Sequence, residues 1–396
     1  MAKSINFYLK NGFLNVKKLL SVMKQVPFLF ATGGRNIGKT YGVVKYLIFG
    51  DDGTGQGRDP LIKNIDFDAK LPWDENVFPF MFLRRTQAQA DAIANEQNNI
   101  LSKILLNYFE DTGQHSDVVV KFKTMSMCKC VHCMYLCDKN EEGEYEINED
   151  KLICYITSIK AFGTKNGVDM PHVNLLLLDE FQRVPGEDKM SREAERAWNI
   201  YKSVQRDRIR RGRPALRFLF LSNANELNNP YYKSYKCIDD VVEMGKIKQV
   251  FKKIRHFGLV LFYDSPISEY DAENDPLYDN LNGGDDRYAK MAVNNEFKMT
   301  KSELVKPRNL GDCRPICSIN DITFYEYKER GESFVYVSYT NKGGRQYGGS
   351  KAEHMRFAVS EKWLWEAFLN SYMRFESYGV MCNFHDCWDL SLWEDV

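Results

Sequence analysis

Short runs of consecutive apolar residues recur along the first two thirds of the chain, and helical segments lie between several of them. Such a run is typical of a strand that is buried on both faces of a parallel sheet. A helical spacing is seen in Ala90, Ile93 and Ala94, which share one helix face. Strands that alternate with helices predict an α/β fold with a central, mostly parallel sheet. The expected strands are 28–31, 78–83, 118–122, 152–159, 175–178, 218–221 and 259–263.

The pattern changes after Asp264. Residues 265–287 are rich in Asp, Asn, Gly and Pro, which predicts a linker, and 286–297 have the spacing of a short helix. Short strands at 323–327 and 334–339 and an aromatic helix near 363–372 then predict a small α+β domain. We therefore expect three parts: an α/β domain over 1–265, a linker with a short helix over 266–311, and a C-terminal domain over 312–396.

The first expected strand leads directly into a phosphate-binding sequence. Residues 33–40 read G-x-x-x-x-G-K-T, and a helical segment follows through Phe49. The glycines of such a loop let backbone N–H groups converge on phosphate oxygens, and the helix N-terminus adds partial positive charge. Lys39 is expected to reach the β- and γ-phosphates of ATP, and Thr40 to bind Mg²⁺. The expected nucleotide site is the whole loop: Gly33, Gly34, Arg35, Asn36, Ile37, Gly38, Lys39 and Thr40.

Two later strands end in polar residues that suit the same site. Four leucines lead into Asp179 and Glu180. With Thr40, Asp179 is expected to hold Mg²⁺, and Glu180 to polarise the water that attacks the γ-phosphate. After the strand 218–221, Asn223 is positioned to sense the γ-phosphate by a hydrogen bond; an ordinary strand-to-loop turn explains that asparagine equally well.

An arginine-rich run lies between these two strands. Residues 206–213 contain five arginines, among them Arg206 and Arg208. One interpretation is an arginine supplied to a neighbouring subunit's γ-phosphate. A second is contact with nucleic acid phosphates, and a third is a solvated helix end, where arginine suits the helix dipole. The residues alone leave all three open.

Composition limits the class of protein. The chain of 396 residues is 44% apolar and has a formal net charge of zero, which gives no global case for nucleic acid binding. No run approaches the roughly 18 apolar residues of a membrane span, and no secretory signal opens the sequence. We therefore expect a cytosolic protein without a membrane partner, in which cysteines are reduced thiols or metal ligands.

Four cysteines gather within ten residues: Cys128, Cys130, Cys133 and Cys137. The spacing of Cys130 and Cys133 suits tetrahedral zinc, and the other two thiols would complete the coordination. The alternative is that these cysteines pack as small apolar residues. A second pair of ligands at a distance, which most zinc folds have, is lacking here.

Four motifs in order resemble those of the DNA packaging ATPases of small tailed phages, compact relatives of the large terminase subunits. They are G-G-R-x-x-G-K-T at 33–40, F-L-R-R-T at 82–86, L-L-L-L-D-E-F at 175–181, and L-S-N-A at 221–224 followed by N-P-Y-Y. The resemblance covers most of residues 25–235. Because the first motif is common to many ATPases, the specificity comes from the series of four.

The resemblance implies an additional-strand, conserved-glutamate ATPase (the ASCE class of P-loop ATPases). It implies a homo-oligomeric ring, a pentamer, on the portal (connector) protein at the vertex of a procapsid in the host cytoplasm, where ATP hydrolysis drives double-stranded DNA inward. It gives Lys39 and Thr40 the phosphate and Mg²⁺, Asp179 the metal and Glu180 catalysis, and it makes 222–224 the coupling motif. Arg35 contacts the γ-phosphate within its own subunit, and the trans-acting arginine is Arg206 or Arg208.

Large terminases also carry a C-terminal nuclease of the ribonuclease-H type, which needs several carboxylates to hold two metal ions. The expected strand 334–339 offers no carboxylate at the required place. We therefore expect a vestigial nuclease-like domain without cleavage activity, which contacts DNA, the portal or a scaffolding RNA.

Two other functions remain open at this stage. A helicase or recombination ATPase uses the same nucleotide site on single strands and needs no capsid. A nucleotide-binding scaffold or switch binds ATP without sustained turnover, although such a protein has no use for Glu180.

Overall fold

The computed structural model describes residues 7–263 and 301–389, except for 24, 35–36, 50–78, 96–99, 105–106, 108–117, 148, 150–151, 165–169, 171–172, 184–186, 188, 207, 213–214 and 342. The chain forms two compact units. Unit 1 comprises Met1–Gln182, Glu195–Asn225 and Lys248–Glu296; unit 2 comprises Arg183–Ala194, Glu226–Ile247 and Phe297–Val396. The two units interleave along the sequence, whereas the composition suggested consecutive domains. Residues 264–300, which hold most of the expected linker and its helix, lie outside the described residues.

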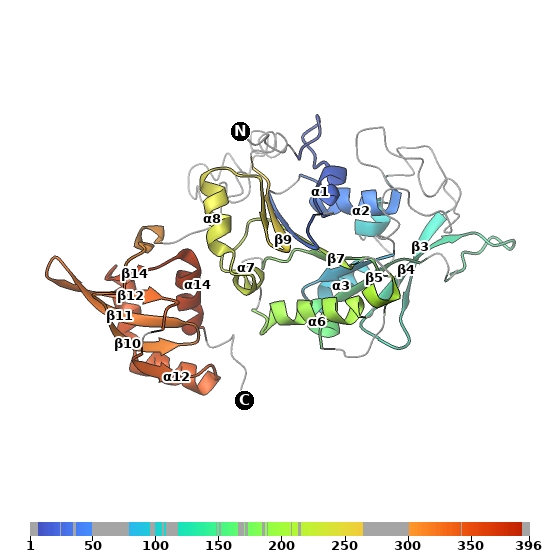
Figure 1. The fold of residues 1–396 in the computed structure, drawn as a ribbon. Helices are drawn as coiled ribbons and strands as arrows, with labels where there is room; N and C mark the ends of the chain where they lie inside the picture. The colour runs from blue at the N-terminus through green and yellow to red at the C-terminus, as the bar shows by residue number, and fades with distance from the viewer. Residues whose placement is uncertain are drawn as a thin grey trace, which may run out of the picture. The chain divides into compact units, whose positions relative to one another are not determined.

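Unit 1 is built on a nine-stranded sheet with the order β3-β4-β5-β2-β6-β7-β1-β9-β8. Strands β3, β4, β5, β7 and β9 of this sheet are labelled in Figure 1. The six strands from β5 to β9 in this order are parallel to their neighbours, as the apolar runs predicted. The strands are β1 (Phe28–Thr32), β2 (Phe80–Arg84), β3 (Val118–Thr124), β4 (His132–Asp138), β5 (Leu152–Ser158), β6 (Leu175–Asp179), β7 (Arg217–Ser222), β8 (Phe251–Ile254) and β9 (Phe257–Leu261).

Strand β4 lies between the expected strands 118–122 and 152–159 and was not predicted from the sequence. β4 pairs antiparallel with β3 on one side and with β5 on the other, so a three-stranded meander forms that edge of the sheet. The cysteines of β4 weakened its strand signal in the sequence. In the structure its alternate residues Cys133, Tyr135 and Cys137 lie on one buried face. At the opposite edge, β8 was also missed, because its two adjacent lysines, Lys252 and Lys253, weaken the apolar signal.

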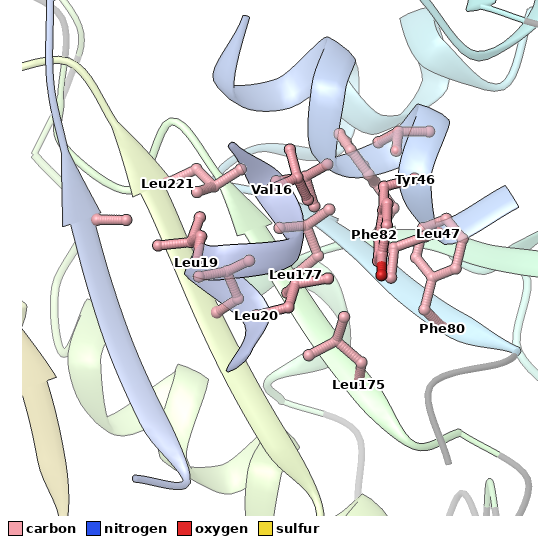
Figure 2. Close-up of a cluster of buried hydrophobic side chains, with 14 of the residues drawn as sticks. Val16, Leu19, Leu20, Tyr46, Leu47, Phe80, Phe82, Leu175, Leu177 and Leu221 are labelled. Atoms are coloured by element: carbon pink, nitrogen blue, oxygen red, sulfur yellow. The ribbon is translucent and has the colours of Figure 1, made fainter. Parts of the chain in front are cut away.

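Helices cover both faces of the unit 1 sheet. On one face, α1 and α2 pack against alternate residues of the central strands, including Phe82, Leu177 and Leu221 (Figure 2). On the other face, Trp198 of α6 contacts the rings of Phe218 and Phe220. Because both faces are buried, a continuous apolar strand such as β6 is stable here. The helices are α1 (Val16–Val22), α2 (Lys39–Phe49), α3 (Gln87–Ile93), α5 (Ile159–Phe162), α6 (Glu193–Gln205) and the 3₁₀ turn η3 (Ile209–Arg211).

Unit 2 contains a five-stranded sheet with the order β13-β10-β11-β12-β14. Strands β10, β11 and β12 form an antiparallel meander, and β13 and β14 pair parallel at its two edges. Aromatic residues from one sheet face and from the helices form the core, with Phe324, Phe357 and Phe384 in contact. The elements are η4 (Ser302–Leu304), β10 (Arg314–Ile319), β11 (Ile322–Glu329), β12 (Glu332–Ser338), β13 (Arg345–Tyr347), α12 (Lys351–Ser360), α13 (Lys362–Leu369), β14 (Met373–Phe375) and α14 (Tyr378–Cys387).

Two helices that follow β7 in the sequence, α7 (Pro230–Ser234) and α8 (Ile238–Lys246), also belong to unit 2. The Asp239 carboxylate accepts a hydrogen bond of 2.8 Å from the Tyr378 N–H at the start of α14. Lys233 forms an ion pair with Asp386 near the end of that helix. A carboxylate suits a helix N-terminus, since the first N–H groups have no partner within the helix. No helix among the described residues is long and apolar enough to cross a membrane.

Candidate nucleotide-binding site

Four neighbouring parallel strands of unit 1 end at the same edge of the sheet, and polar residues gather there. In sheet order the strands are β2, β6, β7 and β1. The first three end in Arg84, Asp179 and Ser222, and the fourth leads into Gly33. The edge at the carboxyl ends of parallel strands is where α/β folds bind ligands. The fold therefore brings together the motifs that the sequence kept far apart.

The loop between β1 and α2 requires glycine at two described positions. A Cβ on Gly33 would lie 2.7 Å from the Phe262 ring and 2.9 Å from the Ile37 side chain. Gly38 has a φ of +75°, in the left-handed region that side chains disfavour. The loop is also tied to the neighbouring strand, because the Gly33 N–H donates to the Ser222 carbonyl at 3.1 Å. Arg35 and Asn36, both expected in the nucleotide site, lie outside the described residues.

Lys39 is the first residue of α2, and its side chain is buried among acceptors. Its ammonium donates to the carbonyls of Gly33, at 3.1 Å, and Gly34. It also donates to Asn223 Oδ1 at 2.9 Å. For Asn223 the sequence left a γ-phosphate sensor and an ordinary turn residue equally open, and the structure places it against the lysine that is expected to bind that phosphate.

Thr40 and Asp179 are in direct contact. The Thr40 hydroxyl donates to Asp179 Oδ1 at 2.6 Å, so α2 and β6 are joined through the two expected Mg²⁺ ligands. Glu180 follows with a φ of +55°, which turns the chain sharply after β6. Its side chain is 41% exposed, whereas that of Asp179 is 6% exposed. The buried carboxylate and the more exposed one thus suit the two different roles that were expected for them.

The donor set fits Mg²⁺. This ion prefers hard oxygen ligands, keeps several waters and takes only one or two protein side chains, the rest coming from substrate phosphates. A hydroxyl and a carboxylate in contact meet that requirement. Among the described residues no group of three His, Cys, Asp or Glu side chains forms a metal cage. A site with two protein ligands has no need of such a cage.

Arg84 is a site residue that the sequence did not single out. Its Nη1 donates to Asp179 Oδ2 at 2.6 Å, and its Nη2 donates to Glu180. One guanidinium therefore binds both the expected metal ligand, Asp179, and the expected catalytic carboxylate, Glu180, as the planar fork of arginine allows. The available signal was the F-L-R-R-T motif at 82–86, which contains Arg84 but was given no role in the site, because strand neighbours cannot be read from the sequence.

Two solved structures resemble this chain over nearly its whole length. The DNA packaging motor gp11 of phage Phi-28 matches with a TM-score of 0.59 at 16% identity, covering 97% of this chain and 99% of that one. The genome packaging motor assembly of bacteriophage Phi-29 matches with a TM-score of 0.55 at 17% identity, covering 96% and 99%. This chain has the fold of the phage packaging motors. No protein-family model and no curated protein matches it.

The packaging-motor fold confirms the resemblance that the four sequence motifs indicated. At these identities the likeness establishes the fold, and the roles of individual residues rest on the geometry described above. That geometry brings together Lys39, Thr40, Asp179 and Asn223, and it adds Arg84.

The two arginines considered for a trans-acting role differ sharply in exposure. The Arg206 side chain is exposed to solvent after the end of α6. Arg208 is 1% exposed, and it donates to the Val173 carbonyl at 2.7 Å and to the Asn174 side chain. Arg208 therefore stabilises the segment that leads into β6 within its own chain.

The zinc interpretation of the cysteine cluster is not supported. Cys133 and Cys137 lie in an apolar cluster on one face of β4. Cys128 and Cys130 lie in the preceding turn, with 3.3 Å between their sulfur atoms. Burial raises the pKa of the Cys130 thiol to about 11, so this thiol is protonated at neutral pH in the metal-free chain. No group of three metal-binding side chains occurs among the described residues. Cys133 and Cys137 pack as small apolar residues in their cluster.

Proposed function

We propose that this protein is an ATP-driven translocase that packages double-stranded DNA into a viral procapsid. The observation that carries the proposal is the contact of Lys39 with Asn223, and of Thr40 with Asp179, at one edge of a packaging-motor fold. A phosphate-binding lysine, a metal-binding pair and a polar sensor at one site are the parts of an ATP hydrolase.

The strand order supports assignment to the ASCE class. Strand β7 lies between the strand of the phosphate loop, β1, and the strand of Asp179, β6. This inserted strand is the additional strand of that class, and it carries Asn223 at its end. The sensor residue therefore lies between the phosphate loop and the acidic pair, where it can respond to both.

Each residue of the site is proposed to have a different role in ATP hydrolysis. Lys39 binds phosphate oxygens, and Thr40 and Asp179 would hold a Mg²⁺ ion that would neutralise charge on the phosphates. Glu180 orients a water in line with the bond to be broken and accepts its proton as the oxygen attacks the γ-phosphorus. ADP then leaves as the bond to the bridging oxygen breaks. Glu180 must part from Arg84 for this step, because the carboxylate has to face the water.

We assign the trans-acting role to Arg206. A residue that acts on a neighbouring subunit must be exposed on its own, and Arg206 is exposed while Arg208 is enclosed. An arginine supplied in this way stabilises the charge that develops on the γ-phosphate. Arg35 is proposed to contact the same phosphate from within the subunit.

The assembly that fits this function is a homopentameric ring on the portal protein of a procapsid in the host cytoplasm, with a scaffolding RNA as a further partner. With a formal net charge of zero, a single subunit has little general attraction for DNA. A ring presents several copies of each basic loop to one duplex, which raises the effective affinity without new contacts. ATP hydrolysis around the ring would then move the duplex.

Unit 2 is proposed to be a vestigial nuclease of the ribonuclease-H type. Its three-stranded meander with parallel edge strands supports this origin. At the end of β12 the chain has Ser338, whose hydroxyl donates to Glu376 at 2.8 Å. A two-metal nuclease needs several carboxylates at one place, so we propose that this unit binds DNA, RNA or the portal without cleaving nucleic acid.

The experiment that tests the function is steady-state ATP hydrolysis by wild type and Glu180→Gln, with and without long double-stranded DNA. We expect DNA to stimulate the wild type. We expect Glu180→Gln to bind ATP but to lose about 10²- to 10⁴-fold in turnover, the contribution of a general base. Glu142→Gln, in an exposed turn, is the matched control. Stimulation by single strands instead would indicate a helicase, and ATP binding without turnover in any condition would indicate a scaffold.

A further inference from the structure

Gln182 is a fully buried polar residue that connects three parts of the nucleotide site. Its side-chain Nε2 donates to the Thr32 hydroxyl at 3.4 Å, at the end of β1. Its side-chain oxygen accepts from the Asn225 N–H at 2.9 Å. Its backbone N–H donates to the Ser222 hydroxyl at 3.3 Å, at the end of β7. One amide thus ties the strand before the phosphate loop to the segment around Asn223.

Gln182 is also the last residue of unit 1 before the chain enters unit 2. The chain passes from unit 1 to unit 2 between Gln182 and Arg183, and again between Asn225 and Glu226. The two passages are joined twice. Gln182 binds Asn225 within unit 1, and within unit 2 the Arg183 guanidinium binds the Glu226 carboxylate at 3.1 and 3.2 Å. The two segments are therefore held to each other by side-chain hydrogen bonds in both units.

The contacts of Lys39 indicate how a bound γ-phosphate would affect the two linked segments at 182–183 and 225–226. A lysine ammonium has three protons, and here they are directed at the Gly33 and Gly34 carbonyls and at Asn223 Oδ1. A γ-phosphate that binds Lys39 must displace at least one of these acceptors. Release of Asn223 frees the segment that continues, two residues later, into the Asn225 N–H held by Gln182.

We propose that Gln182 is a positioning residue that transmits the state of the γ-phosphate to the paired passages into unit 2. This inference rests on the proposed ATP-dependent function and assigns the connection to one side chain. The amide is suited to the task because it uses a donor and an acceptor at the same time. No apolar residue of the same size can hold both Thr32 and Asn225.

The test is hydrogen exchange of the full-length chain with and without Mg²⁺ and ATPγS, comparing wild type with Gln182→Met. Methionine keeps the volume and removes both hydrogen-bonding groups. In the wild type we expect ATPγS to change exchange in the phosphate-loop helix, 39–49, and in unit 2 over 226–247. In Gln182→Met we expect the first change to remain and the second to shrink by about fivefold or more, the scale of a typical coupling between sites.

Gln205→Met is the matched control. The Gln205 side chain also accepts a backbone N–H, that of Leu216, at 2.6 Å, but it lies at the opposite end of β7. Gln205→Met should therefore show the same ATPγS-induced change in hydrogen exchange over 226–247 as the wild type. If Gln182→Met does not fold, Thr32→Val removes one partner only and should reduce the response of 226–247 in the same direction. The proposal would be overturned if a folded Gln182→Met or Thr32→Val variant showed the same ATPγS-induced change over 226–247 as the wild type. It would also be overturned if Gln205→Met lost that change to the same extent as Gln182→Met.

Steady-state kinetics provide a second measurement, the stimulation of kcat by DNA, which a purely structural role of Gln182 would leave unchanged. We expect the KM for ATP of Gln182→Met to stay within about twofold of the wild type, while stimulation of kcat by DNA falls about fivefold or more. A rise in KM with stimulation intact would overturn the assignment. Failure of the proposed function itself gives a different pattern in the wild type: either no change over 39–49 with ATPγS, or that change without stimulation of ATP hydrolysis by double-stranded DNA.

Discussion

Arg84 and Glu180 are joined by a charge-assisted hydrogen bond, and the same guanidinium binds Asp179 with 2.6 Å between the paired atoms. Arg84 ends β2 and Glu180 follows β6, so the bond crosses between neighbouring strands. A catalytic base has to be positioned against its water. The orientation of Glu180 therefore depends on whether Arg84 holds it, and with Glu180 as the proposed base we expect Arg84 to restrain hydrolysis.

Replacing Arg84 with glutamine should raise ATP hydrolysis in the absence of DNA and reduce the stimulation by DNA. A charge-assisted hydrogen bond contributes about 1.5 kcal/mol or more, which corresponds to about a tenfold change in the population of released Glu180. The measurement is kcat with and without double-stranded DNA, together with the Kd of ATPγS.

Arg84→Lys is the informative companion, because lysine keeps the charge but lacks the fork that binds two carboxylates. We expect it to fall between wild type and Arg84→Gln. A drop in hydrolysis under both conditions, with nucleotide binding unchanged, would show instead that Arg84 holds Glu180 in its active orientation.

Thr40→Val should raise the Mg²⁺ concentration needed for half-maximal hydrolysis. Valine preserves the shape of threonine and removes the oxygen that contacts Asp179 at 2.6 Å. Loss of one oxygen ligand should shift the requirement about tenfold, since a contact to a charged group contributes about 1.5 kcal/mol. Thr40→Ser keeps the hydroxyl and should behave like the wild type. A Mg²⁺ titration of Thr40→Val that matches the wild type would remove Thr40 from the metal site.

Much of the fold could be predicted from the sequence, because the strongest signals are local. Four consecutive leucines before Asp179 are typical of a strand covered on both faces, and they form one here; glycines at 33 and 38 meet steric requirements of the loop itself. Which further residues join the site depends on the order of the strands in the sheet. Arg84 and Gln182 became site residues only because β2 and β7 both flank β6, and no periodicity in the sequence reports which strands are neighbours.

The interleaved units were beyond sequence reasoning for the same reason. Helix α8 follows β7 in the chain, yet Asp239 binds the backbone of Tyr378, which is 139 residues away. Composition along the chain separates consecutive segments and cannot detect a segment that packs with a distant one. β4 was missed because cysteine gives no strong strand signal, although Cys133 and Cys137 occupy the alternate positions of a buried strand face.

Arg206→Ala should lose ATP hydrolysis, whereas Arg208→Ala should lose stability. Arg206 is exposed, so its loss should leave the folded chain and ATPγS binding intact while hydrolysis by the assembled ring falls about 10³-fold. Arg208 is enclosed and donates to Val173 and Asn174, so its loss should lower the free energy of unfolding by about 2 kcal/mol through acceptors left without a donor. Thermal unfolding and ATP hydrolysis, measured on both variants, separate the two effects.

Mixing subunits tests whether the arginine acts in trans. Arg206→Ala subunits keep an intact nucleotide site, and Lys39→Ala subunits keep the arginine. A mixed ring should recover part of the activity that each variant lacks alone, because one kind supplies the arginine to the other. Absence of any recovery, in rings shown to contain both kinds of subunit, would place Arg206 outside the catalytic contact between subunits.

The turn before β4 should contain thiols that react slowly and hold no metal. Burial, with the nearby Cys128 thiol, raises the pKa of Cys130 from its usual value of 9.0 to about 11. The folded chain therefore keeps this proton until the pH approaches 11, and at pH 8 its thiolate fraction is about 100-fold below that of the unfolded chain. We expect iodoacetamide to label Cys130 about 100-fold more slowly in the folded chain, with the rate rising as the pH is raised toward 11. Treatment with a zinc chelator should leave both the labelling and the Tm unchanged. Faster labelling after chelation, with stoichiometric zinc released, would restore the metal interpretation of the cluster.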